Sequence, residues 1–232
     1  MGLTMVINFG ELENFCKEND FIIISDEMLA QEGMYKNLVY TTNNNFVGKS
    51  VYPVDMPIIM NKEVWNKLVD VNNDLKKVGK CITIYDAYRP IQIQRLFWDY
   101  FYNTHGYYDE TLVANPNKYG THNIKINAVD MFISNSDGRP IELPCEFDDF
   151  TEKANIYYSD CSKEALFNRD LLINTAKKYG LIVNESEWWH FFDERIVEKG
   201  MKFNYLQSDL IPIGEEKIFL LQKLDEPKKF KK

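Results

Sequence analysis

The sequence predicts a single α+β domain with a mostly antiparallel central sheet flanked by helices. Its 232 residues are enough to bury one full core. Apolar residues make up 45% of the chain and aromatic residues 14%, which is typical of a globular protein. Helical and strand-like segments are interspersed without regular strand–helix–strand alternation, which disfavours a parallel sheet. No internal repeat or low-complexity linker divides the chain, so we expect one domain over residues 1–232.

The first half of the chain predicts two strands and two helices. Apolar, β-branched runs indicate short strands at 21–24 and 81–85. Between them, apolar residues recur on one helical face over 62–78, and Gly79 is suited to end that helix. A proline ends the second strand, and an amphipathic helix is expected over 91–102.

The second half begins with a polar loop and then continues the sheet. An Asp-Gly pair indicates a hairpin turn. Another segment has apolar residues on one helical face and a glycine at its end. The expected elements are a loop at 106–125, a strand at 127–133, a turn at Asp137-Gly138, a helix at 163–179, and strands at 181–183 and 188–192.

Composition excludes several classes of partner. The net charge of −8 and the pI near 5.0 disfavour binding to a nucleic-acid backbone, and the basic run at 228–232 is typical of a solvated tail. No run of 18 apolar residues is present, so we expect no membrane span. The first residues do not resemble a secretory signal, and the four cysteines are scattered, so we expect a cytoplasmic protein. Nothing in the sequence predicts the oligomeric state.

Two histidines and an aspartate carry the chemical signal. His122 lies eight residues before Asp130, and His190 ends the sequence Glu-Trp-Trp-His. Two imidazoles and one carboxylate leave a fourth position open on a tetrahedral Zn²⁺, which is typical of a catalytic site. Asp130 lies in an apolar stretch, where an unpaired carboxylate would be unfavourable by several kcal/mol. The alternative is that the histidines are packed, hydrogen-bonded side chains.

Four segments occur in a characteristic order: Asp86-Ala87-Tyr88-Arg89-Pro90, residues 122–130, Phe147-Asp148, and Glu187-Trp188-Trp189-His190. This order resembles the D-alanyl-D-alanine dipeptidases (VanX-type zinc enzymes) and, more broadly, the zinc DD-peptidases, which include VanY-type carboxypeptidases. The similarity runs from about residue 40 to about residue 190. It includes residues 40–48, which look like the dipeptidase N-terminal loop and favour a dipeptidase. Residues 196–232 would be a C-terminal extension.

The resemblance implies a catalytic site with one zinc ion per chain. The zinc ligands would be His122, Asp130 and His190. Glu187 would be the general base for a metal-activated water, and Arg89 would stabilise the oxyanion of the tetrahedral intermediate. The free ammonium of the substrate would be held by Asp148 and Tyr40.

The implied reaction is hydrolysis of the dipeptide D-Ala-D-Ala to two D-alanines. It would serve glycopeptide resistance, by limiting D-Ala-D-Ala in cell-wall peptidoglycan precursors, or D-alanine recycling. The alternatives are a D,D-carboxypeptidase that acts on larger cell-wall peptides, and a zinc-binding protein of the same fold without catalysis. Arg89 could instead pair a surface carboxylate, and Asp148 could belong to a solvated acidic cluster with Asp149.

The spacing of the first two ligands departs from the family pattern. The family separates its histidine and aspartate by seven residues with a glycine between them, and it has serine where Gly120 stands. A regular strand of eight residues would span roughly 26 Å, too far for two ligands of one ion. We therefore expect a bulged loop within 123–127 with Lys125 outward, in which Asn123 and Asn127 adopt the turn conformations. Glu187 and His190 also need local irregularity, because a three-residue offset reverses side-chain direction on a flat strand.

Overall fold

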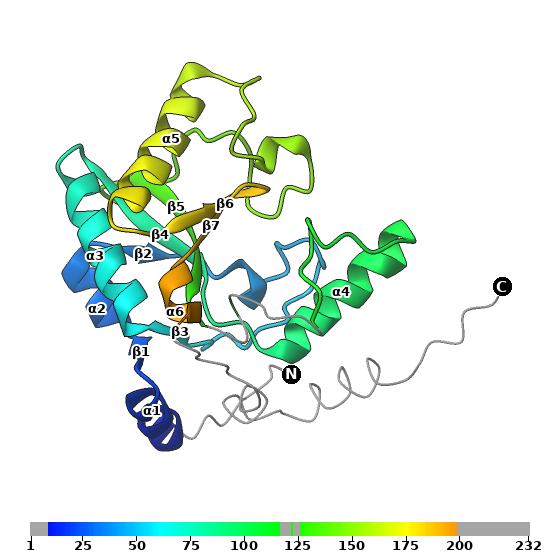
Figure 1. Ribbon diagram of the computed structural model, residues 1–232, viewed down its shortest axis with the longest axis horizontal. Coiled ribbons are helices and arrows are strands. Elements are labelled where there is room, and N and C mark those ends of the chain that lie inside the picture. Colours follow the sequence, from blue (N-terminus) through cyan, green and yellow to red (C-terminus); the bar gives the residue numbers. More distant parts are fainter. Residues whose placement is uncertain (1–8, 117–121, 123–125, 199–232) are drawn as a thin grey trace.

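The computed structural model describes residues 9–116, 122 and 126–198, and it confirms the predicted α+β class (Figure 1). The central sheet has the spatial order β2 (Tyr35–Lys36), β4 (Lys80–Asp86), β5 (Ala128–Asn135), β7 (Glu187–Phe192), β6 (Ile182–Asn184). In this sheet β2 and β4 are parallel, and the remaining neighbours are antiparallel. A separate antiparallel pair consists of β1 (Phe21–Ile24) and β3 (Ile58–Asn61).

The helices are interspersed with these strands along the chain. In order they are α1 (Phe9–Glu18), α2 (Asp26–Glu32), the 3₁₀ helix η1 (Val39–Thr41), α3 (Lys62–Lys76), α4 (Ile91–His105), the 3₁₀ helix η3 (Glu152–Ala154), α5 (Lys163–Lys178) and α6 (Glu194–Glu198). Within the described ranges, no helix combines the length and apolar character needed to cross a membrane.

Every predicted strand and helix is present, with ends that differ by a few residues. The helix predicted over 62–78 ends at Lys76, and the one predicted over 91–102 continues to His105. The short elements α1, α2, β2, β3 and α6 were not predicted. α2 has only seven residues, too few for a clear helical period, and its signals are local: Ser25 caps its start and Gly33 follows its end at φ 61°.

Side-chain caps fix where the two long helices beside the sheet begin. The Asn61 side chain accepts a hydrogen bond from the Glu63 amide at 2.8 Å at the start of α3. The Ser162 hydroxyl accepts one from the Ala165 amide at 3.0 Å at the start of α5. Each cap satisfies an amide that the helix itself cannot, which stabilises the helix by about 1 kcal/mol.

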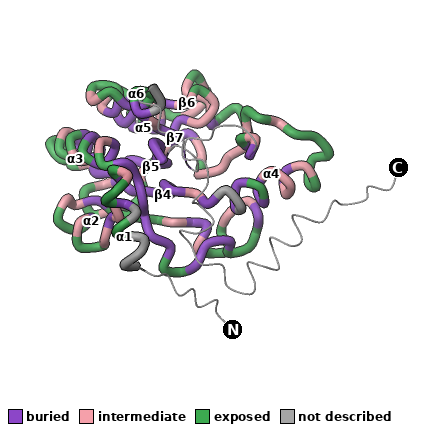
Figure 2. The backbone as a smooth tube through the Cα atoms, turned by 60° about the horizontal axis from the view of Figure 1, so that its bottom comes forward, coloured by how far each residue is buried: buried purple, intermediate pink, exposed green. Residues whose placement is uncertain are grey.

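The central sheet separates two layers (Figure 1). Helices α3 and α5 contact each other and pack on strands β4–β7, and their apolar faces are buried there. The other side of the sheet lies against α4 and the chain around η1, with a second cluster that includes Tyr40, Tyr88, Phe97 and Phe101. Strands β4, β5 and β7 form the buried centre, and the outer helix surfaces are exposed (Figure 2). The candidate site borders this second cluster.

Candidate metal centre

Three acid–base residues form a row across the middle of the central sheet. Asp130 on β5 pairs with Asp86 on β4 and with His190 on β7. Directly paired residues of antiparallel strands project to the same face, so these three side chains meet. A bulge in β4 shifts the register after Ile84, so that Asp86 and not Tyr85 lies opposite Asp130.

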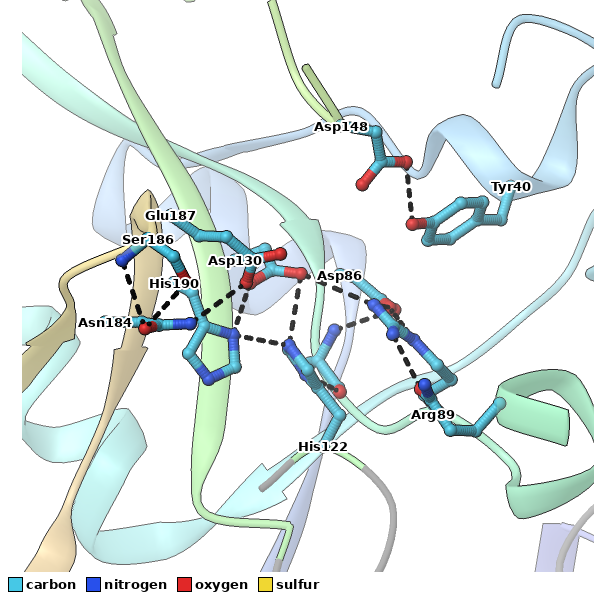
Figure 3. Close-up of polar contacts among 12 residues, drawn as sticks. Tyr40, Asp86, Arg89, His122, Asp130, Asp148, Asn184, Ser186, Glu187 and His190 are labelled. Carbon is cyan, nitrogen blue, oxygen red and sulfur yellow. Dashed lines mark hydrogen bonds and ion pairs between the residues drawn. The ribbon is translucent and has the colours of Figure 1, made fainter. Parts of the chain in front are cut away.

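His122 completes the cluster from outside the sheet. Its Nε2 lies 3.1 Å from Asp130 Oδ2 and 3.0 Å from His190 Nδ1, and His190 Nδ1 lies 2.9 Å from Asp130 Oδ1 (Figure 3). Four ligands at about 2.0–2.1 Å from a tetrahedral zinc are about 3.3 Å apart, close to these separations. The three donor groups therefore fit one metal ion. Among the described residues, His122, Asp130 and His190 are the group placed closely enough to hold one.

Backbone contacts bring His122 back to Asp130. His122 Nδ1 lies 2.6 Å from the Ala87 carbonyl oxygen, and the Arg89 amide donates to the His122 carbonyl at 3.2 Å. The Ala87 oxygen can only accept, so Nδ1 carries the proton and Nε2 keeps its lone pair for a ligand. His122 therefore lies beside Asp130, whereas residues 123–125 of the predicted bulged loop lie outside the described residues.

The backbone conformation of the described residues before Asp130 differs from the prediction. Ile126 has a φ of 52°, whereas Asn127 is not among the described non-glycine residues with positive φ. Expecting Asn127 to adopt the left-handed conformation was therefore wrong. Asn127 is held in place instead, because its side-chain amide donates to the Asp193 carbonyl and its own carbonyl accepts from the Asp193 amide. Gly120, Asn123 and Lys125 lie outside the described residues.

The charge states of the cluster suit metal binding. Burial alone would raise the pKa of Asp130, but the electrostatic interaction and hydrogen bond with His122 and the hydrogen bond with His190 hold it well below its usual range. Burial lowers the pKa of His190. An ionised carboxylate and a neutral imidazole are the forms that bind a metal.

Arg89 is held beside the cluster by a buried carboxylate. Its Nε and Nη2 each lie 2.9 Å from Asp86 Oδ2, and Nη2 is 3.6 Å from Asp130 Oδ2. Burial would lower the pKa of Arg89, but the charge of Asp86 raises it well above its usual range, so Arg89 stays a cation. The Tyr52 hydroxyl donates to both oxygens of Asp86. The alternative that Arg89 pairs a surface carboxylate is wrong.

Tyr40 and Asp148 form a pair at the far side of the pocket. The Tyr40 hydroxyl donates to Asp148 Oδ2 at 2.8 Å. Burial, and then the charge of Asp148, raises the pKa of Tyr40 well above its usual range, so the hydroxyl remains a donor. Burial raises the pKa of Asp148 to about 7. Asp148 is partly buried and bonded to Tyr40, so it is not part of a solvated acidic cluster. Its φ of 60° is a strained, left-handed backbone conformation.

Glu187 lines the same pocket as His190 although three residues separate them. The pairing of β6 with β7 is irregular there, jumping from Val183↔Phe191 to Asn184↔Glu187, which is the local irregularity expected from the sequence. The Asn184 side-chain amide donates to Glu187 Oε2 at 3.3 Å. Burial, followed by the charges of Asp130 and Asp148, raises the pKa of Glu187 to about 8.

These side chains line one cavity of about 250 Å³. Pockets that hold drug-sized ligands measure about 300–1,000 Å³, so this one fits a small molecule. The sequence predicted seven of its residues: Tyr40, Arg89, His122, Asp130, Asp148, Glu187 and His190. It did not indicate Gln94 or Asn184, or the role of Asp86 behind Arg89. The available signal for Asp86 was its position at the end of a buried strand, three residues before Arg89.

A buried His–Asp–His cluster that could hold a metal ion, in a small pocket with further carboxylates, is suited to metal-dependent hydrolysis of a small substrate. The sequence model of the D-ala-D-ala dipeptidase family matches residues 21–205. That match covers most of the chain and extends beyond residues 40–190, the segment that resembles the family in its motifs. The chain belongs to this peptidase family.

A bacterial enzyme is similar over part of the chain. The chain is 28% identical over 154 residues to the D-alanyl-D-alanine dipeptidase of Escherichia coli (strain K12). The similar region covers 66% of this chain and 76% of that enzyme.

The raised pKa of Glu187 predicts a pH-dependent stability for the metal-free protein. Between about pH 5 and about pH 8 the folded protein keeps a proton on Glu187 that the unfolded chain releases, so this contribution is present at low pH and lost as pH rises. Glu187→Gln holds no such proton. In urea unfolding with chelator present, we expect the wild type to lose stability relative to Glu187→Gln over this range. Parallel curves would contradict the raised pKa.

Proposed function

We propose that this protein hydrolyses the dipeptide D-Ala-D-Ala to two D-alanines with one bound zinc ion. The observation that supports this most directly is the convergence of His122, Asp130 and His190 within a buried pocket. Membership of the D-ala-D-ala dipeptidase family supports D-Ala-D-Ala as the substrate. Zinc is the metal that two imidazoles and a carboxylate favour at a catalytic site.

The proposed ligand atoms are His122 Nε2, His190 Nδ1 and a carboxylate oxygen of Asp130. When bound, zinc polarises the scissile carbonyl and lowers the pKa of a coordinated water toward about 7. The Ala87 carbonyl contributes indirectly, because its contact with His122 Nδ1 fixes the orientation of that imidazole.

Glu187 is the proposed general base. It accepts a proton from the attacking water and returns it to the nitrogen of the leaving D-alanine. Burial raises the pKa of Glu187 to about 8 in the metal-free protein, and a zinc ion bound nearby would lower it, so that the ionised carboxylate can accept the proton of the water. The hydrogen bond from Asn184 holds one of its oxygens.

Arg89 is the proposed stabiliser of the oxyanion. Asp86 fixes one edge of the guanidinium, and the rings of Tyr40 and Phe97 lie 5.5 and 5.1 Å from its central carbon. A cation held in this way needs no reorganisation when negative charge develops on the carbonyl oxygen.

Charge balance supports a substrate with a free ammonium. Asp130, Asp148 and Glu187 line the pocket beside one guanidinium, and Asp86 lies behind it. With no cation bound, the pKa values of Asp148 and Glu187 are raised to about 7 and about 8, and a divalent metal and an ammonium group together would favour the ionised forms of both carboxyls. Asp148 and Tyr40 are the proposed partners of the ammonium. The carboxylate is already oriented by the Tyr40 hydroxyl and held partly buried, which raises its affinity for a cation.

The size of the pocket is suited to a dipeptide. A cavity of about 250 Å³ holds a small substrate, which supports the dipeptidase. The proposed reaction would act in the cytoplasm on D-Ala-D-Ala before its use in peptidoglycan precursors, or would recycle D-alanine. Residues 1–232 would form one catalytic domain, with 196–232 as its C-terminal extension.

The reaction can be tested by incubating zinc-loaded protein with D-Ala-D-Ala and measuring released D-alanine. We expect turnover, and we expect Glu187→Ala to lower kcat by about 10²–10⁴-fold, because only proton transfer is removed. Glu185→Ala is the matched control, since Glu185 is exposed and bonds Tyr157 outside the pocket. No D-alanine from the wild type would refute the activity, and near-normal turnover by Glu187→Ala would remove its role as base.

Blocking the amino group tests Asp148. If this carboxylate binds the free ammonium, N-acetylated D-Ala-D-Ala should have a kcat/KM lower by about 10–100-fold or more, because the carboxylate loses its cation in the complex. Asp148→Asn should reduce the difference between free and blocked dipeptides, whereas Asp149→Asn should preserve it. Equal kcat/KM for the two substrates would favour the carboxypeptidase.

A further inference from the structure

Gln94 bridges Arg89 and the opposite wall of the pocket. It lies in the first turn of α4, its side chain is 2% exposed, and it lines the cavity. Its Oε1 accepts a hydrogen bond from Arg89 Nη1 at 2.8 Å. Its Nε2 donates to the carbonyl of Ala114, also at 2.8 Å. Both ends of one buried amide are therefore used.

Chemistry fixes the orientation of this amide. A guanidinium can only donate and a carbonyl oxygen can only accept, so the reversed amide would place two donors together and two acceptors together. An uncharged side chain must therefore combine an acceptor and a donor to make both bonds at once. Asparagine carries the same amide on a side chain that is one methylene shorter, so it would not reach both partners. Glutamine meets these requirements at position 94.

Gln94 and Asp86 hold different parts of the same guanidinium. Asp86 accepts from Nε and Nη2, whereas Gln94 accepts from Nη1. A single carboxylate leaves a guanidinium free to pivot about the shared contact, and a second acceptor at another nitrogen removes that freedom. The plane of Arg89 is then set by two partners on opposite sides.

The other bond of Gln94 reaches residues 110–114, which we call the wall segment because each of them lines the pocket. This segment is held at a second point, where the Ser186 hydroxyl donates to the Thr111 carbonyl at 3.1 Å. The Ser186 hydroxyl also lies 3.2 Å from Asn184 Oδ1, and it forms no hydrogen bond with Arg89. Of these two anchors, the one at Gln94 contacts the guanidinium.

We propose that Gln94 is a positioning residue that orients Arg89 toward the reacting carbonyl while it fixes the wall segment at Ala114. The inference rests on the proposed function, because Arg89 must act on the reaction for its orientation to matter. It predicts that the effect of Gln94 on catalysis passes through Arg89, and that the effect of the Ser186 anchor does not.

A double-mutant cycle tests this directly. We would measure kcat on D-Ala-D-Ala for Gln94→Met, Arg89→Ala and the double variant, with zinc content and circular dichroism as checks of folding. Gln94→Met has similar volume and removes both bonds. It should lower kcat by about 10–100-fold in the wild type, as expected for a hydrogen bond to a charged group, and by less than about threefold in Arg89→Ala.

Two further variants complete the design. Ser186→Ala removes the other anchor of the wall segment and should change kcat by the same factor in both backgrounds. Gln94→Glu keeps an acceptor for Arg89 and should retain kcat within about tenfold of the wild type, so it tests the proposal even if Gln94→Met fails to fold. A Gln94→Glu variant as slow as Arg89→Ala would overturn the assignment.

The outcomes separate the two claims. An active wild type in which Gln94→Met has equal effects with and without Arg89 would overturn the role of Gln94 alone. A folded, zinc-loaded wild type that releases no D-alanine would overturn the proposed function and this inference together.

Discussion

The structure depends on one electrostatic constraint: three buried polar groups that lie within about 3 Å of one another. His122 and His190 share the carboxylate of Asp130 in the middle of the sheet, with separations of 2.9–3.1 Å. Burying a carboxylate is unfavourable unless a positive charge or several donors compensate for it. In the proposed enzyme a zinc ion meets this need, and the surrounding carboxylates are then available for the water and the ammonium.

The fold meets this constraint by interrupting its own regularity. A bulge in β4 places Asp86 opposite Asp130, and an irregular pairing of β6 with β7 allows Glu187 and His190 to line one pocket. Ile126, four residues before Asp130, adopts a positive φ. These deviations lie at the site, where strained backbone is characteristic of function, while α3 and α5 pack on a regular core.

Sequence reasoning predicted the long elements and the set of polar residues, but not the details of their support. Helices such as α3 and α5 repeat their apolar residues over several turns, and β5 is apolar from Ala128 to Ile133 apart from Asp130, so their patterns are clear. The chemical types of His122, Asp130 and His190 marked them without any structure. Gln94 carries no such signal, because its importance comes from a contact between α4 and Ala114 that is distant in sequence. The turn at Ile126 was mispredicted because tertiary contacts there override the preference of isoleucine for negative φ.

X-ray absorption at the zinc edge of the purified protein is the most direct test of the proposed centre. We expect one zinc per chain, with only nitrogen and oxygen neighbours at about 2.0–2.2 Å, including two imidazoles. We also expect His190→Ala to lose most of its zinc. Sulfur neighbours at about 2.3 Å, or full zinc occupancy in His190→Ala, would contradict the centre formed by His122, Asp130 and His190.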